Sequence, residues 1–283
     1  MNRRLVVAAG STAVGAALVL SGCNGDGTTG TENMRLSANQ ALLKSAQKAE
    51  AADVFRADLT VTTTGGEAGR LHAAGQFRVR PALQFSARLD DVQRGGRTLP
   101  GVSGQALFKD NVLYAKVPKL AKFVSEGKPW LRLDVNEVAQ RTGLDVQGLL
   151  KQVDRVDPAD QTKMFTGSKD ARKVGTEQVD GVRTIHYTGT VTVRDALNRL
   201  DAEARQKVRG WLPPEAGEGR IRFDLWADGQ SLPRKIVWKG ADKQGDGGSV
   251  TVLYSDYGKS FGVNPPPADQ VGRLSLGSLL GGS

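Results

Sequence analysis

The sequence has one cysteine and two histidines among its 283 residues, and this scarcity excludes several kinds of chemistry. A single cysteine forms no disulfide within the chain, so we expect stability to come from burial and hydrogen bonds. His72 and His186 lie far apart in the sequence, and neither belongs to an HxxH or HExxH spacing. The sequence therefore offers no zinc site.

Motifs for nucleophilic or phosphate chemistry are missing too. No G-x-S-x-G elbow, P-loop or G-x-G-x-x-G fingerprint is present, and the match at residues 101–104 is too short to count. Acidic pairs such as Asp90-Asp91 stand at expected turns, where exposure to solvent is the ordinary interpretation. We expect no enzyme and no cofactor, with an enzyme acting on wall or lipid as a third, less supported hypothesis.

After residue 20 the chain has no second apolar run long enough to span a membrane, so we expect a soluble body. The formal net charge is +9, but lysine and arginine are interspersed with acidic residues, as in residues 201–207. Nucleic acid binding favours a clustered basic stripe, so no nucleic acid partner is expected. An ordinary solvated surface and attraction to anionic headgroups or wall polymers both stay open.

The feature that is present, and most informative, is Cys23. Two arginines precede an apolar run from Leu5 to Leu20, which is followed by Ser21, Gly22 and the cysteine. A basic start, an apolar core and small residues before a cut predict a secretory signal. The segment resembles the lipobox of bacterial lipoproteins, in which the cysteine thiol carries a diacylglyceryl group and becomes the N-terminus. The main alternative is a permanent span, although the run makes a helix of only about 24 Å against a bilayer core of about 30 Å.

We therefore divide the chain into four parts. Residues 1–22 are expected to be the signal peptide, and residues 23–34 the lipidated cysteine with a Gly/Thr-rich tether. Residues 35–264 form the folded domain. Residues 265–283, which begin with three prolines, are expected to be a loose tail.

The hydrophobic pattern of the domain predicts an α+β fold. Leucines at helical spacing over residues 36–52 predict an amphipathic helix with Ser37 as its N-cap. Period-two alternation predicts strands, with Asp180-Gly181 as a hairpin turn. The strand ranges are 55–62, 70–80, 83–90, 105–108, 112–117, 130–134, 172–179, 182–193, 220–227, 234–240 and 249–257. Further helices are expected over 136–141, 146–156, 158–165 and 194–211.

Strands that alternate need cover on one face only, so we expect a large curved antiparallel sheet with helices on its concave side. Apolar residues on that face either fill an ordinary core or line a cavity for a lipid tail. The cavity candidates are Leu59, Val61, Leu71, Phe77, Val79, Phe85, Leu131, Leu133, Ile185, Tyr187, Phe223 and Leu225. Leu89, Ile221, Ile236 and Val252 share the face.

The order of these features resembles the actinobacterial LppX/LprAFG lipoprotein family. Beyond the lipobox, the resemblance rests on Asp180-Gly181 followed by His186-Tyr187 and Gly189. It also rests on Leu232-Pro233-Arg234 and on Tyr254-Ser255-Asp256-Tyr257-Gly258 near the end. The resemblance covers about residues 36–264. It implies a LolA-like fold, in which an incomplete antiparallel barrel wraps around helices with an apolar cavity between them.

The resemblance implies binding of an acylated lipid or lipoglycan and its carriage or presentation in the cell envelope. The partners would be that cargo, the outer face of the cytoplasmic membrane through lipidated Cys23, and an envelope transporter. No catalytic residue is implied, and His186 is expected to be structural and to point outward. The alternative is an envelope sensor of the same fold that acts through protein–protein contacts, without cargo.

Overall fold

The computed structural model describes residues 36–65, 68–99, 102–116, 118, 125, 127–142, 156–202, 205–206, 219–241 and 247–273. Cys23, the signal peptide and the tether lie outside these residues, as does nearly all of the helix expected over 146–156. No described helix is long and apolar enough to cross a membrane.

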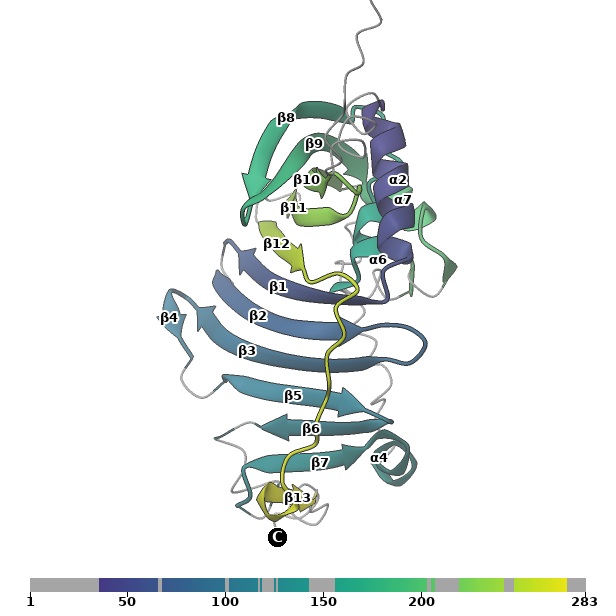
Figure 1. Cartoon of the computed structure of the whole chain (residues 1–283). Helices are drawn as coiled ribbons and strands as arrows, with labels where there is room; N and C mark the ends of the chain where they lie inside the picture. Colours follow the sequence, from purple (N-terminus) through teal and green to yellow (C-terminus); the bar gives the residue numbers. More distant parts are fainter. Residues whose placement is uncertain are drawn as a thin grey trace, which may run out of the picture.

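One sheet, antiparallel except for its last pair of strands, organises the described residues (Figure 1). Its order is β13-β7-β6-β5-β3-β2-β1-β12-β11-β10-β9-β8, with β4 paired to β3, and β8 and β13 remain its two edges. The strands are β1 (Val54–Thr63), β2 (Gly69–Arg78), β3 (Gln84–Arg94), β4 (Arg97–Thr98), β5 (Gly104–Lys109), β6 (Val112–Lys116), β7 (Trp130–Asp134), β8 (Arg172–Val179), β9 (Val182–Thr192), β10 (Arg220–Asp228), β11 (Pro233–Ala241), β12 (Gly247–Ser255) and β13 (Val271–Arg273). The expected α+β class and open, incompletely closed sheet are confirmed.

Turn chemistry fixes the register of the hairpins. Asp180 and Gly181 both have positive φ, at 48° and 77°, which gives β8 and β9 the tight turn that matches strand twist. Asp110 and Asn111 do the same between β5 and β6, with φ of 51° and 60°. Aspartate and asparagine tolerate this left-handed region better than other residues that carry a Cβ.

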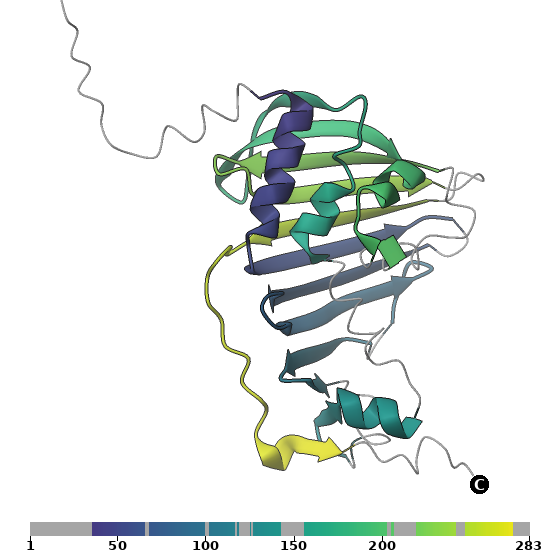
Figure 2. The same cartoon turned by 90° about the vertical axis from the view of Figure 1, so that its right-hand side faces the viewer.

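The helices gather on one face of the sheet (Figure 2). Helices α2 (Ala38–Glu50), α6 (Pro158–Lys163) and α7 (Val193–Asn198) lie over the end that contains β8–β12, and α4 (Val135–Thr142) lies at the β7 end. Helix α2 begins at Ser37 with a capping box, since the Ser37 Oγ accepts from the Gln40 amide at 3.3 Å and Gln40 Oε1 accepts from the Ser37 amide at 3.0 Å. Pro158 follows the Asp157 N-cap of α6, as predicted.

Two expectations are wrong in detail. The helix predicted over 194–211 is interrupted: α7 ends at Asn198 with Arg199 as its C-cap, residues 202, 205 and 206 are helical again, and residues 203–204 and 207–211 lie outside the described part of the chain. Of the tail predicted to be loose over 265–283, residues 268–273 instead form a 3-10 turn (Ala268–Gln270) and then β13, while residues 274–283 lie outside the described part of the chain. Strand β13 pairs with β7 in parallel, so a segment beyond the expected boundary completes the sheet. Strands this short carry too little alternation to be recognised in a sequence.

Candidate functional site

The apolar face of the sheet is the candidate site, and it divides into two regions. In the first, β9–β12 lie beneath the helices, and the large apolar side chains on the covered face, such as Phe223, Leu225 and Ile236, are fully buried. Phe223 on β10 stacks on Phe165, which follows α6, with ring centroids 4.4 Å apart and an interplanar angle of 14°. Gly189 on β9 leaves room for these groups, because a Cβ there would lie 2.6 Å from Ser168 Oγ and 2.9 Å from the Phe223 ring.

Several cavity candidates belong to this first region. Ile185, Tyr187, Phe223 and Leu225 all join the main core cluster with Leu42 of α2. Their contacts match the ordinary-core interpretation of the sequence. Ile221, Ile236 and Val252 are buried in the same cluster.

The second region lies on β12, β1, β2, β3 and β5, where the strand register places rows of side chains directly opposite one another. One row consists of Phe55, Phe77, Phe85 and Phe108, which we call the aromatic row. The ring centroids of successive members of the row lie 5.6, 6.1 and 5.6 Å apart, in the order β1, β2, β3 and β5. The row is buried, and the Phe77 ring lies over Gly75, where a Cβ would come within 2.9 Å of it.

Beyond the aromatic row the same face carries smaller aliphatic side chains that stay half-buried. We call this set the aliphatic patch: Leu59, Val61, Leu71, Leu89, Val92 and Val250. Val61 is opposite Leu71 on one side and Val250 on the other, and Leu71 is opposite Val92. The patch is thus one continuous apolar surface over four strands.

The patch was only partly identifiable from the sequence. Leu59, Val61, Leu71 and Leu89 follow from alternation, whereas Val92 and Val250 were missed. Val92 lies beyond a bulge in the β2–β3 pairing, between His72 and Ala73, which shifts the alternation by one residue. The remaining candidates Val79, Leu131 and Leu133 are half-buried outside the patch.

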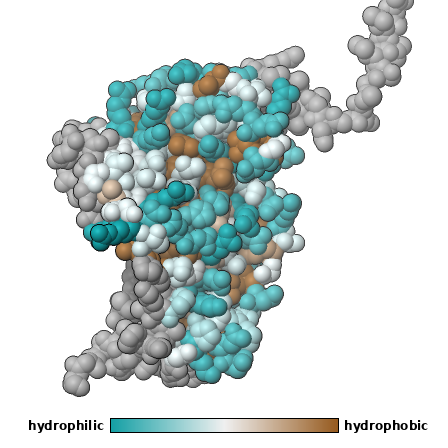
Figure 3. All heavy atoms as spheres, turned by 90° about the vertical axis from the view of Figure 1, so that its left-hand side faces the viewer, coloured by the Kyte–Doolittle hydropathy of each residue, from teal (hydrophilic) through white to brown (hydrophobic). Residues whose placement is uncertain are grey.

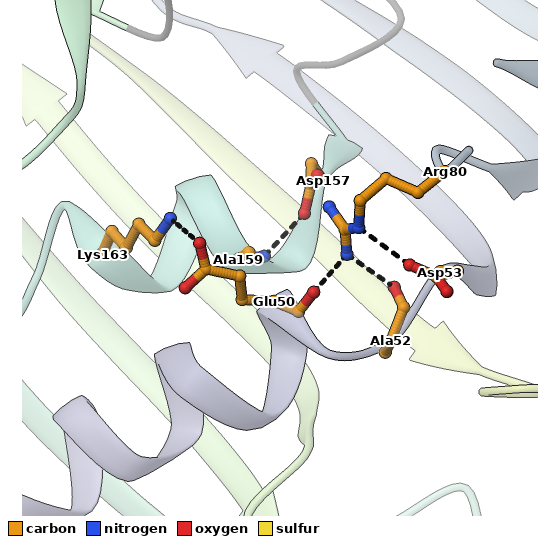
Figure 4. A network of polar contacts seen from close by, with 7 residues as sticks. All are labelled: Glu50, Ala52, Asp53, Arg80, Asp157, Ala159 and Lys163. Atoms are coloured by element: carbon orange, nitrogen blue, oxygen red, sulfur yellow. Dashed lines mark hydrogen bonds and ion pairs between the residues drawn. The ribbon is translucent and has the colours of Figure 1, made fainter. Parts of the chain in front are cut away.

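Polar contacts hold the helices over this face (Figure 4). Arg80, beyond the end of β2, donates from Nε to Asp53 at 2.8 Å and from a terminal nitrogen to the carbonyls of Glu50 and Ala52. A cation on the last carbonyls of α2 satisfies groups that the helix leaves unpaired. Lys163 of α6 donates to Glu50 at 2.9 Å, so α2, α6 and the sheet are joined at one corner.

Asp170 fixes the chain between α6 and β8. Its carboxylate accepts from the amide and hydroxyl of Thr190, both at 2.7 Å, and from Ser168 Oγ at 2.9 Å. The Thr190 side chain is the strongest of these influences, followed by its backbone amide, and together they lower the pKa of Asp170 to about 2. The bonds favour the ionised form.

This shift predicts a pH dependence of stability. The folded-state pKa is below the ordinary 3.8, so the stabilisation is complete above about pH 4 and is lost as pH falls toward 2. We expect Asp170→Asn to lower the urea midpoint of unfolding at pH 7. This difference in midpoint between the variant and the native chain should disappear by pH 2. Asp110→Asn in the β5–β6 turn is the control, because no described group donates to that carboxylate. A gap that stays constant from pH 7 to pH 2 would contradict the prediction.

Both histidines lie on the opposite, convex face, and His186 is structural there. His186 stacks on Trp226 with centroids 4.1 Å apart, and its two nitrogens contact Glu177 at 2.8 Å and Asp224 at 2.9 Å. Hydrogen bonds from Trp226 and then from His186 lower the pKa of Glu177. This arrangement joins β8, β9 and β10, which matches the expectation that His186 points outward. Among the described residues, no group of three or more His, Cys, Asp or Glu side chains could hold a metal ion.

Comparison with known proteins gives distant relatives, and no family model matches. The chain is 31% identical over 220 residues to an uncharacterized 31.2 kDa protein of Streptomyces griseus encoded between rplA and rplJ, covering 77% of this chain and 64% of that one. It is 26% identical over 216 residues to a Streptomyces coelicolor protein described as a candidate lipoprotein, covering 74% and 66%. The chain thus spans slightly less than two thirds of the length of these relatives.

The solved structures that align with this chain include two mycobacterial proteins, LprF and the lipoprotein LppX. LprF from Mycobacterium bovis aligns with a TM-score of 0.47 and 15% identity, over 81% of this chain and 96% of that one. LppX from Mycobacterium tuberculosis aligns with a TM-score of 0.44 and 14% identity, over 80% and 98%.

Proposed function

We propose that this chain is a lipid-anchored, extracytoplasmic, non-enzymatic protein that binds the acyl part of a lipid or lipoglycan on the concave face of its sheet. The observation that carries the proposal is the aliphatic patch. Its side chains stay half-buried while the neighbouring aromatic row and the helix-covered core are buried. Because burial of each methylene gains about 0.8 kcal/mol, an alkyl chain laid on such a surface is held without any polar group.

Two further observations support the class of the protein. The lipobox-like segment ending at Cys23 supports an anchor on the outer face of the cytoplasmic membrane, and the Streptomyces coelicolor relative is described as a lipoprotein. Carriage of the lipid to another site, and an envelope transporter that would receive it, follow from the family resemblance alone. These two claims extend the proposal beyond lipid binding.

The experiment compares two lysine variants on neighbouring strands. Leu71→Lys places a charge in the aliphatic patch, while Thr62→Lys places one on the convex face of β1. A buried leucine side chain contributes about 1.5–3 kcal/mol. Leu71→Lys should therefore lower the affinity for a fluorescent fatty acyl probe roughly tenfold or more. Thr62→Lys should bind as the native chain does. Native mass spectrometry of protein extracted from its own membranes should show a co-purifying lipid that the Leu71→Lys variant lacks.

A second candidate function rests on the packing beneath the helices. There Phe223, Leu225, Ile236 and Val252 are fully buried with Leu42, as in a filled interface. A filled interface favours an envelope sensor that works through protein contacts. If no lipid co-purifies and neither lysine variant alters probe uptake, the sensor becomes the better hypothesis.

A further inference from the structure

A polar hollow lies on the convex face of the sheet, the side opposite the helices. The space is about 230 Å³, and its floor is formed by Ala74, Gly75 and Ala87. The rim residues come from β1, β2, β3 and β5: Arg56, Gln76, Ser86, Arg88, Gln105 and Leu107. Figure 3 shows this side of the molecule, where hydrophilic residues cover most of the surface around smaller apolar areas.

The strand register explains why the hollow exists. Arg56, Gln76 and Ser86 lie directly opposite one another on β1, β2 and β3 and form one wall. On the next row Ala74 lies opposite Arg88, which lies opposite Gln105. Ala74 is only 5% exposed and carries a single methyl group, so the long side chains around it enclose a depression.

The polar groups of the rim are available for a ligand. Among the described residues, the side chains of Arg56, Gln76, Ser86 and Gln105 have no hydrogen-bond or ion-pair partner. Arg88 donates to Asp90 through Nε at 2.8 Å, and its terminal nitrogens have no other described partner. Two guanidinium groups, two amides and a hydroxyl therefore surround one small space.

Three acidic residues near the hollow each contact a group outside it. His72 contacts Asp58 at 3.0 Å and Asp90 at 3.4 Å, which places it between the two carboxylates. Asp90 also accepts from Arg88, and Asp256 accepts from Lys259 at 2.8 Å while the charge of Arg56 contributes to lowering its pKa. None of the three aspartates is part of the lining. The lining therefore carries two positive charges, from Arg56 and Arg88, together with the donor groups of Gln76, Ser86 and Gln105, and it contains no acidic residue.

We propose that this hollow binds a phosphate group carried on a small hydroxylated molecule. Guanidinium groups match the geometry and charge of phosphate oxygens, and the amides and Ser86 suit adjoining hydroxyls. The phosphate ester could be free in solution or could be the headgroup of an anionic lipid. This site is separate from the acyl-binding face and does not depend on it.

Calorimetry of the full chain purified in detergent tests the proposal with defined probes. The probes are glycerol 3-phosphate, short-chain phosphatidylglycerol and, as uncharged control, glycerol. The double substitution Arg56→Gln with Arg88→Gln should lower the affinity for the phosphate probes roughly tenfold or more. The reason is that hydrogen bonds from a charged guanidinium group to phosphate are stronger than those from a neutral amide. Arg70→Gln on β2, an exposed arginine outside the lining, removes the same kind of charge and should change binding less than twofold.

The outcomes separate the two sources. Arginine-dependent binding of glycerol 3-phosphate assigns a free phosphate ester, and arginine-dependent binding of phosphatidylglycerol alone assigns a lipid headgroup. The acyl-binding variant Leu71→Lys should leave glycerol 3-phosphate binding intact, which keeps this test apart from that of the proposed function. Absence of binding for both phosphate probes, or equal weakening by Arg70→Gln, overturns the proposal. Unchanged circular dichroism and thermal midpoint would show that the double variant is folded.

Discussion

Replacing Cys23 by serine should release the protein from the membrane fraction. The serine hydroxyl accepts no thioether-linked diacylglyceryl group, so the acyl chains that we propose as the anchor would be missing. Each buried methylene of an acyl chain contributes about 0.8 kcal/mol, and two or more chains give stable anchoring. The effect should therefore be close to complete. Fractionation with detection by antibody measures it, together with the mass of the N-terminal peptide.

Thr28→Ser in the expected tether is the matched control, and it should stay with the membrane as the native chain does. The native N-terminal peptide should begin at Cys23 and carry the mass of acyl chains. If the native protein itself retains residues 1–22 and carries no acyl chains on Cys23, the apolar run is a permanent span and the lipoprotein interpretation is wrong. This outcome would leave the acyl-binding face untouched.

Replacing Phe223 by alanine should cost about 3–5 kcal/mol in the free energy of unfolding. The ring is fully buried, stacks on Phe165 and closes the space that Gly189 leaves on β9. A cavity there would remove contacts between the sheet and the segment after α6 at once. Because domains have only about 5–15 kcal/mol of stability, the variant should unfold at a much lower urea concentration.

Val174→Ala on the edge strand β8 is the control for Phe223→Ala. Val174 is 49% exposed, so its truncation should change stability by less than about 0.5 kcal/mol. Phe223→Leu, which keeps most of the buried volume, should fall between the two. Similar urea midpoints for Phe223→Ala and Val174→Ala would show that the interface between helices and sheet is not tightly packed.

Local signals in the sequence gave most of the elements and failed where the signal was weak. The Asp180-Gly181 turn and the Ser37 cap were predictable, because their physics involves only neighbouring residues. The helix predicted as continuous over 194–211 is interrupted after Asn198, where Arg199 is the C-cap of α7. Polar residues at helical spacing are weak evidence when packing does not support them.

The candidate site was predictable only as a set of positions on one face. Alternation placed Leu59, Val61 and Leu71 together, but it could not separate them from Phe223 and Leu225, which have the same pattern. The difference between the two groups comes from which strands α2, α6 and α7 cover, and this is a matter of tertiary packing. The convex hollow was missed because each of its residues is an ordinary polar position in its own strand.

The sequence by itself determined the strands, their turns, the face on which apolar residues gather and the lipobox-like Cys23, because period-two alternation and short motifs act within a few residues. Only the tertiary structure decided the sheet order, the addition of β13 beside β7, the division of the apolar face into a buried core and a half-buried patch, and the placement of Arg56 and Arg88 around one hollow. These features depend on register between strands that are distant in the sequence. No local pattern encodes such pairing, since it is chosen by the burial of the whole face at once.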